Sequence, residues 1–353
     1  MPKDVYNQFS NQLLAWHKTL DRPLPWKGTR NPYLIWVSEI ILQQTRAAQA
    51  TPYYLKITER YPEVQSLASA PIDELLSLWQ GLGYYSRARN LHHSANVIVN
   101  QHKGIFPSNY DDILALKGIG KYTAAAISSF AYDQAYPVID GNVIRIMSRF
   151  FDISEPIDTK DGKHKIEQFV DAVFNGKKAA LFNQAIMDFG ATVCVPKKPL
   201  CHTCPFEENC QALAAGTISS RPTKSKKLKR KKRNFNFLFF EKEGHILIEK
   251  RNANDIWKGL YQLPLIEGQE FTKRGKLIDK IQLDFNLTTD ALPVYTHRQL
   301  LTHQEIHSIV WSLDRIPDNP AAANRIWVPK NNLENYGFPK TMTLFFEDYL
   351  YIG

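Results

Sequence analysis

The sequence has no long hydrophobic run, at its start or elsewhere. Charged and amide side chains interrupt the N-terminal segment, so no apolar core of signal-peptide length forms there. No segment approaches the roughly 18 consecutive apolar residues of a membrane span, and no repeat of about 20–50 residues is visible. These absences argue against secreted, membrane-spanning and solenoid classes, and we expect a soluble, cytoplasmic protein.

Cysteine is scarce and confined to one place. All four cysteines lie in the pattern Cys194-x6-Cys201-x2-Cys204-x5-Cys210. A secreted disulfide protein would spread its cysteines to join distant loops, so this clustering indicates a metal site in a reducing compartment. Four thiolates in one compact loop suit zinc or a [4Fe–4S] cluster. Zinc ribbons usually present two close cysteine pairs, whereas this loop has one.

Length and charge indicate two domains and an acidic partner. A chain of 353 residues with 44% hydrophobic residues is long for a single core. Its net charge of +9 favours a polyanion, either nucleic acid or an anionic membrane surface. Charge alone fits equally well a soluble protein that binds neither.

The pattern of apolar residues changes once along the chain. Residues 1–215 are mostly helical, with helices predicted at 33–42, 71–79, 111–116, 122–130, 142–151 and 178–193. Residues 216–234 carry a basic run that cannot bury itself, and we interpret them as a solvated linker. Residues 235–353 form a β-rich α+β domain, with strands at 235–240, 245–249, 308–313 and 327–328 and a helix at 271–283.

A glycine motif, Leu116-Lys-Gly-Ile-Gly120, separates two of the predicted helices. Glycines permit positive φ and close approach of the backbone. The free N–H groups of the next helix can then hold a phosphate without reading sequence. A simple turn between helices is the usual alternative, but the Leu-x-Gly-x-Gly frame favours a DNA-binding hairpin.

Two carboxylates are candidates for catalysis. Glu39 lies within an apolar helix, where burial would raise its pKa and keep it protonated as a general acid. A glutamate at the one wet edge of that helix is the ordinary alternative. Asp140 follows an apolar pair 20 residues beyond Gly120 and precedes a helix, a position where an aspartate is often only an N-cap.

Together these motifs resemble MutY-type adenine DNA glycosylases, which are related to endonuclease III. The resemblance runs from about Phe9 to Ala214 and continues more loosely to the C-terminus. It is carried by Leu24-Pro-Trp26, Ser38–Thr45, Gly81–Asn90, Leu116–Gly120, Ile139–Asn142, Phe182–Gly190 and the cysteine loop. It implies a mainly α helix–hairpin–helix glycosylase domain with a [4Fe–4S] loop at 194–210. A smaller Nudix-like domain would follow, in which Trp257–Pro264 is the clearest match.

The implied activity is hydrolysis of the N-glycosidic bond of adenine opposite 8-oxoguanine or guanine in duplex DNA, in base excision repair. By the same resemblance, Glu39 protonates a flipped adenine and Asp140 stabilises the positive sugar, while Tyr122 and Asn142 orient these groups and water. The implied adenine pocket contains Trp26, Lys27, Leu42 and Gln184. DNA contacts are implied for Gln44, Thr45, Tyr84, Gly118, Gly120 and Lys121, with Gln44 and Tyr84 as wedges. The cluster ligands would be Cys194, Cys201, Cys204 and Cys210.

Three departures refine this expectation. Bifunctional relatives carry a lysine where this chain has Tyr122, so a monofunctional enzyme without efficient lyase activity is predicted. The lesion-reading Phe-Ser-His of the family is matched only by Leu301-Thr302-His303. Residues 271–287 lack the glutamate-rich metal box of a Nudix hydrolase, so nucleotide hydrolysis is not expected.

Two other functions stay open at this stage. One is an endonuclease III-like bifunctional pyrimidine glycosylase and lyase, and the other is a non-catalytic zinc DNA-binding protein. In each case the partner is duplex DNA. We expect a monomer with no membrane partner.

Overall fold

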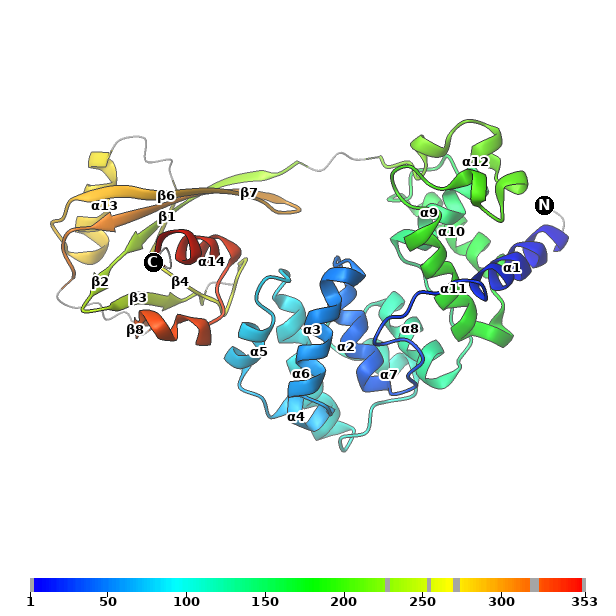
Figure 1. The fold of residues 1–353 in the computed structure, drawn as a ribbon, viewed down its shortest axis with the longest axis horizontal. Coiled ribbons are helices and arrows are strands. Elements are labelled where there is room, and N and C mark those ends of the chain that lie inside the picture. Colours follow the sequence, from blue (N-terminus) through cyan, green and yellow to red (C-terminus); the bar gives the residue numbers. More distant parts are fainter. Residues whose placement is uncertain (1–2, 226–228, 253–254, 269–273, 318–323, 351–353) are drawn as a thin grey trace. The chain divides into compact units, whose positions relative to one another are not determined.

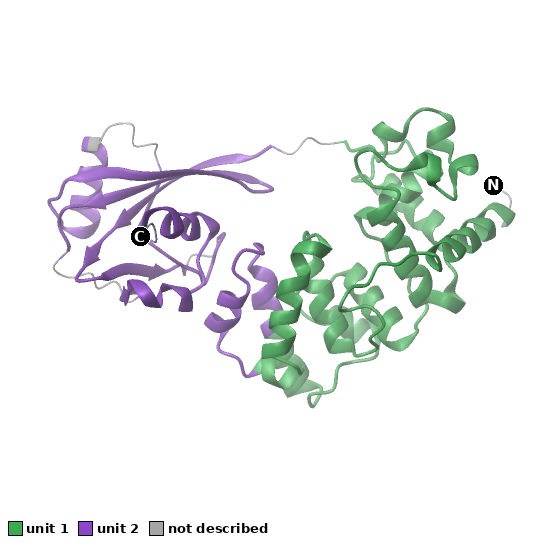
Figure 2. Ribbon diagram, viewed as in Figure 1, with its two compact units in different colours: residues 1–68, 93–227 green, residues 69–92, 228–353 purple. Residues whose placement is uncertain are grey.

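The computed structural model describes residues 3–225, 229–252, 255–268, 274–317 and 324–350 (Figure 1). The chain divides into two compact units (Figure 2). The first unit comprises residues 1–68 and 93–227, and the second comprises residues 69–92 and 228–353. Residues 69–92, which lie within the predicted glycosylase domain, therefore group with the C-terminal part of the chain. Within the described ranges, no helix is long and apolar enough to cross a bilayer.

The first unit is helical. Its elements are α1 (Lys3–His17), α2 (Pro32–Leu42), α3 (Ala47–Arg60), α4 (Val64–Ala68), the second half of α6 (Ser86–Gln101), α7 (Tyr110–Ala115), α8 (Lys121–Tyr132), α9 (Gly141–Phe150), α10 (Lys160–Val173), α11 (Ala179–Thr192) and α12 (Gln211–Ala214). Local chemistry explains several starts. The side chain of Asn31 accepts hydrogen bonds from the first N–H groups of α2, with Pro32 in the first turn.

The core of this unit fixes the helices that carry the candidate site. Phe9 of α1 packs among Phe150 of α9, Phe189 of α11 and Phe206 of the cysteine loop. Each of these aromatic side chains is at most 5% exposed. Because such cores are close-packed, α9 and α11 have little freedom to shift relative to each other.

The second unit combines two sheets with helices. It contains α5 (Ile72–Leu78), β1 (Lys231–Phe239), β2 (Glu241–Lys242), β3 (His245–Lys250), β4 (Tyr261–Gln262), β5 (Leu265–Gly268), α13 (Arg274–Phe285), β6 (Ala291–Leu300), β7 (Gln304–Leu313), β8 (Arg325–Pro329) and α14 (Lys340–Phe345). One sheet has the order β5-β1-β7-β6, with β1 and β7 parallel. The other has the order β2-β3-β4, with β8 also paired to β3. Leu277 and Ile281 of α13 pack on the first sheet.

The strands predicted at 235–240 and 245–249 lie in different sheets. Gly244, with a positive φ, turns the chain between β2 and β3, and Glu241 pairs with Ile246. β1, however, pairs with β5 and β7 of the other sheet, not with β3. All the other predicted helices and strands are present with small shifts at their ends, except that 271–273 lie outside the described residues.

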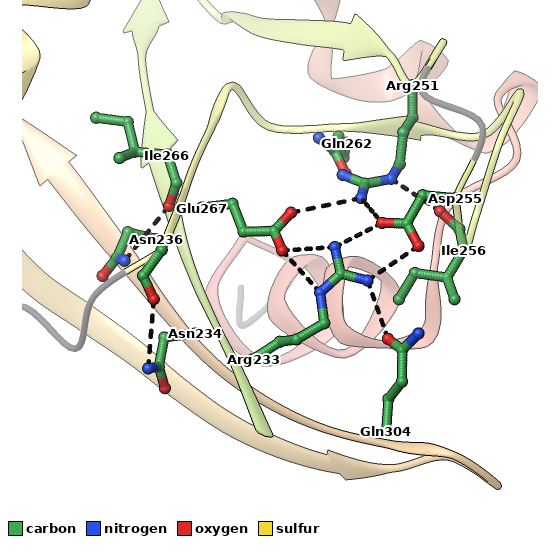
Figure 3. Close-up of polar contacts among 11 residues, drawn as sticks. Arg233, Asn234, Asn236, Arg251, Asp255, Ile256, Gln262, Ile266, Glu267 and Gln304 are labelled. Atoms are coloured by element: carbon green, nitrogen blue, oxygen red, sulfur yellow. Dashed lines mark hydrogen bonds and ion pairs between the residues drawn. The ribbon is translucent and has the colours of Figure 1, made fainter. Parts of the chain in front are cut away.

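A charged cluster anchors the start of β1 (Figure 3). Arg233 donates to Glu267 at 2.7 Å and to Asp255 at 3.0 Å, and Arg251 donates to Asp255 at 2.8 Å. Both guanidinium groups lie over the ring of Phe235, at 4.9 and 5.3 Å from its centroid. Residues 231–234, which the sequence places in the linker, thus belong to the first strand. The last cation of the basic run is an internal ion-pair partner.

Candidate active site

A cavity of about 870 Å³ opens in the first unit. Its walls come from α2, the loop at residues 18–31, α8, the N-terminus of α9 and α11. It brings together nine of the residues singled out from the sequence, namely Trp26, Lys27, Glu39, Leu42, Thr45, Tyr122, Asp140, Asn142 and Gln184. These residues come from segments far apart in the chain, so the fold assembles them.

Glu39 is a buried acid on one wall of this cavity. Its side chain projects from α2 and is 4% exposed, and the described residues offer no hydrogen-bond partner to its Oε2. Burial raises the pKa of Glu39 to about 7. The hydroxyl of Tyr122 opposes this rise by hydrogen bonding, and the charge of Asp140 adds to it. A carboxyl with such a pKa keeps its proton far closer to neutral pH than an exposed glutamate does.

Asp140 is both a helix cap and a cavity residue. Its Oδ1 accepts the backbone N–H groups of Asn142 at 2.9 Å and Val143 at 2.8 Å, which caps α9. Its Oδ2 accepts the side-chain amide of Asn142 at 2.7 Å. Burial raises the pKa of Asp140, and these hydrogen bonds oppose the rise. The carboxylate is therefore held in one orientation at the cavity wall.

Asn142 connects this carboxylate to the cysteine loop through Arg145. Arg145 donates from Nη2 to the side-chain oxygen of Asn142 at 2.8 Å and from Nε to the carbonyl of Cys194 at 2.8 Å. Because a guanidinium only donates, the oxygen of Asn142 must face Arg145 and its NH₂ must face Asp140. Gly190 makes room for this arrangement, since a Cβ there would lie 2.5 Å from the Cβ of Asn142.

Tyr122 separates the two acids from the apolar part of α11. Its hydroxyl contacts the sulfur of Met187 at 3.2 Å and also hydrogen-bonds with Glu39. Burial, followed by the charges of Glu39 and Asp140, raises the pKa of Tyr122 well above its usual range. The residue is thus a neutral phenol. Lys121, its neighbour, is exposed and does not line the cavity.

The glycine motif and the wedge candidates lie outside the cavity lining. Gly118 has a φ of 87°, whereas Gly120 caps α8 with an ordinary φ of −102°. A Cβ at Gly120 would meet nothing within 4 Å, so the bare backbone there is not required by packing. Gln44, directly after α2, has a φ of 60°, a conformation that costs energy for a non-glycine residue.

Tyr84 and the predicted lesion loop meet in the second unit. Leu301, Thr302 and His303 form the turn between β6 and β7. The hydroxyl groups of Tyr84 and Thr302 are 2.5 Å apart, within hydrogen-bond distance. Tyr84 is 49% exposed and has a φ of 48°. A predicted wedge residue and a predicted lesion-reading residue thus share one surface.

The four cysteines surround a second, small apolar cavity. All of them line it, together with aromatic and aliphatic side chains such as Phe189 and Leu213, and none forms a disulfide. Cys194 accepts from Arg149 at 3.5 Å and Cys204 from the N–H of Phe206 at 3.4 Å. In the described part of the chain, no three His, Cys, Asp or Glu side chains converge as a single metal ion requires.

Burial also raises the pKa of Cys204 to about 12, with a further contribution from the other three cysteines. Burial raises the pKa of Cys201 and Cys210 as well, so these three thiols need a positive centre to hold them as thiolates. The chemistry of this donor set therefore fits a metal centre such as an iron–sulfur cluster.

One ionic group in the cavity wall was not foreseen from the sequence. Asp188 of α11 is fully buried and pairs with His17, Arg22 and Lys27. One sequence feature could have indicated it: Asp188 is an acid four residues after Gln184 on an apolar helix, where a charge needs partners. Its three partners come from a segment more than 160 residues earlier, which no local pattern reveals.

The chain matches two domain families. Residues 37–172 match the HhH-GPD superfamily of base excision DNA repair proteins, and residues 236–348 match the NUDIX domain. These matches confirm the predicted fold of a helix–hairpin–helix glycosylase domain followed by a Nudix-like domain.

Curated relatives cover nearly the whole chain. It is 32% identical over 343 residues to an adenine DNA glycosylase of Buchnera aphidicola subsp. Acyrthosiphon pisum (strain APS), covering 97% of both chains. It is 40% identical over 230 residues to an adenine DNA glycosylase of Mus musculus, covering 61% of this chain and 44% of that one.

Solved structures resemble the N-terminal part. A thermostable thymine-DNA glycosylase has a TM-score of 0.55 at 31% identity, covering 60% of this chain and 97% of its own. A non-covalent endonuclease III–DNA complex has a TM-score of 0.54, covering 61% and 98%. At 18% identity, the second likeness shows the fold alone.

Proposed function

Since the chain belongs to the adenine DNA glycosylase family, we propose that it hydrolyses the N-glycosidic bond of adenine paired with 8-oxoguanine or guanine in duplex DNA. The observation that carries this proposal is Glu39, a buried acid with a pKa of about 7, in one cavity with the capped carboxylate Asp140. Such a pair can protonate a leaving base and stabilise the sugar cation that remains.

The acid step follows from the state of Glu39. Burial favours the protonated form at neutral pH, and Oε2 has no hydrogen-bond partner among the described residues. Donation to a ring nitrogen turns adenine into a neutral leaving group, so the glycosidic bond breaks with oxocarbenium character. The neighbouring phenol of Tyr122 stays protonated and keeps Glu39 in place.

Asp140 is proposed to supply the negative charge that stabilises the positive sugar. Its two oxygens accept three hydrogen bonds in all, so its position is set before the sugar arrives. A preorganised carboxylate stabilises the developing positive charge without reorganisation at the moment of reaction. Asn142, oriented by Arg145, holds the Oδ2 side of this group.

The enzyme is proposed to be monofunctional. A phenol cannot form the Schiff base through which a lysine at this position would cleave the strand. Lys121 is the nearest amine in sequence, but it lies one residue away and outside the cavity lining. Water therefore attacks the sugar carbon that has lost adenine, and the strand of the abasic product stays intact.

DNA contact and lesion recognition are assigned to different residues. The turn at Gly118 and Gly120, with the start of α8, is proposed to hold the phosphate backbone through N–H groups. Gln44 and Tyr84 would enter the base stack, and their strained backbones fit residues held ready for insertion. Thr302, hydrogen-bonded to Tyr84, is proposed to read the base opposite adenine.

A [4Fe–4S] cluster is proposed as the resident cofactor, bound by Cys194, Cys201, Cys204 and Cys210. When bound, it would supply structural order to the loop at 194–210. Arg149 and Arg145 join that loop to α9 through the carbonyls of Val195 and Cys194, both at 2.8 Å.

The test compares three duplexes, with adenine opposite 8-oxoguanine, adenine opposite thymine, or thymine glycol opposite adenine. Base loss is read as strand cleavage with and without alkali. Alkali-dependent cleavage at adenine opposite 8-oxoguanine is expected. Alkali-independent cleavage at thymine glycol would instead identify an endonuclease III-like lyase, and binding without base loss would identify a non-catalytic DNA-binding protein.

A further inference from the structure

Asp188 collects an unusual number of donors for one carboxylate. Its side chain is fully buried on α11, next to the cavity. Oδ2 accepts from Lys27 at 2.7 Å, from His17 at 3.0 Å and from Gln184 at 3.1 Å, while Oδ1 accepts from Arg22. A buried carboxylate with this many partners is costly to disturb, because removing it takes an ion-pair partner from two half-buried cations, Arg22 and Lys27.

Three of these donors come from one short segment. His17 ends α1, and Arg22 and Lys27 lie in the loop at residues 18–31, which has no regular secondary structure beyond turns. Lys27 also donates to the carbonyl of Arg22 at 2.9 Å. The same loop places Trp26 and Lys27 in the cavity lining. Asp188 therefore ties one wall of the cavity to α11.

The hydrogen bonds of Lys27 leave one of its three ammonium N–H groups available to a ligand. Of its three ammonium donors, one reaches Asp188 and one reaches the carbonyl of Arg22. The third can serve a group bound in the cavity. A lysine side chain is otherwise flexible, so two fixed bonds restrict where that third donor can lie.

We propose that Asp188 is a positioning residue for base excision, which holds the 18–31 loop, and Lys27 above all, as a fixed wall of the cavity. This inference rests on the proposed function. Asp188 itself takes no part in bond breaking, because both of its carboxylate oxygens are hydrogen-bonded to other side chains of the protein. Its effect passes through Lys27, which distinguishes it from a residue that only stabilises α11.

The experiment uses full-length protein and the variants Asp188→Asn, Lys27→Gln and their combination. Single-turnover excision of adenine opposite 8-oxoguanine is measured, together with affinity for a duplex carrying the slowly cleaved 2′-fluoro-2′-deoxyadenosine. We expect each single variant to excise at least tenfold more slowly and the double variant to be no slower than the slower single. Ile186→Val, a buried change on the same helix, is the matched control and should keep the wild-type rate.

A second readout does not depend on activity. Trypsin cleavage after Lys27, followed by mass spectrometry, should be slow in wild type and in Ile186→Val and several-fold faster in Asp188→Asn. Should Asp188→Asn fail to fold, Arg22→Met removes one partner from the less buried side, at 25% exposure, and should speed the same cleavage.

The outcomes separate the two proposals. Unchanged rates in Asp188→Asn, effects that multiply in the double variant, or unchanged cleavage after Lys27 would each overturn the positioning role. A wild-type protein that does not excise adenine would instead refute the proposed function, while the trypsin result would still decide whether Asp188 holds the loop.

Discussion

Glu39→Gln should make the protein more stable at pH 8 while removing its activity. The ordinary pKa of a glutamate is 4.5, and burial raises that of Glu39 to about 7 in the folded protein. Folding therefore favours the protonated form. This contribution is complete below pH 4.5 and is lost as the pH rises to 7, because the folded protein must then bury a charge.

The size of the effect follows from that shift. A difference of this extent between folded and unfolded pKa corresponds to about 3 kcal/mol of unfolding free energy. Glutamine has nearly the same shape and no charge, so the variant escapes this loss. We expect it to gain up to about 3 kcal/mol over wild type at pH 8 and little at pH 4.5.

The assay is urea unfolding at pH 4.5, 6 and 8, followed by helical circular dichroism. Glu59→Gln, the same change at an exposed site on α3, is the control and should show no pH-dependent difference. The same Glu39 variant should bind the mismatched duplex but excise adenine about 100- to 10,000-fold more slowly. For wild type, the excision rate should fall about tenfold per pH unit above 7.

Two results would refute the reasoning. Equal stability of wild type and Glu39→Gln at pH 8 would mean that Glu39 is not buried as a charge. A wild-type excision rate that stays flat from pH 7 to 9 would mean that its protonated form is not required.

Three further predictions address other parts of the site. Tyr122→Lys should cleave abasic strands without alkali and form a borohydride-trapped adduct; if no adduct appears, the position cannot reach the sugar. Gly190→Ala should slow excision at least tenfold with little loss of duplex affinity, because the new Cβ would collide with Asn142; a normal single-turnover rate would show that Asn142 is not needed to hold Asp140. The purified protein should be yellow-brown and contain iron and sulfide, whereas a colourless zinc-loaded protein would refute the cluster.

The local parts of the fold could be predicted because their causes are local. Asn31 and Pro32 begin α2 through contacts within one turn, and Asp140 begins α9 in the same way. The strand pairing of the second unit was harder to predict from the sequence. β1 lies parallel to β7, about 70 residues away, and a two-residue turn at Gly244 gives no sign of that.

The candidate site shows the same division. The sequence places Glu39 on an apolar helix, but whether it meets solvent depends on α8 and α9, which contribute Tyr122 and Asp140. Its burial excludes a glutamate at a wet edge of the helix and supports the proposed general acid, so that proposal depends on tertiary packing. Likewise, the N-cap and the catalytic role of Asp140 were alternatives in the sequence, and in the structure its side chain both caps α9 and lines the cavity.

No sequence pattern predicts ion pairs between residues that are far apart in the chain. Asp188 on an apolar helix and its three partners His17, Arg22 and Lys27 each look like ordinary solvated residues, since nothing local relates them. Tyr84 and Thr302, which are 218 residues apart, were assigned different tasks and meet in one hydrogen bond. If Tyr84 enters the base stack while Thr302 reads the opposite base, that hydrogen bond must break or move on binding. Breaking this hydrogen bond would then couple the insertion of Tyr84 to the reading of the base by Thr302. The variant Tyr84→Phe would remove that coupling without removing the ring.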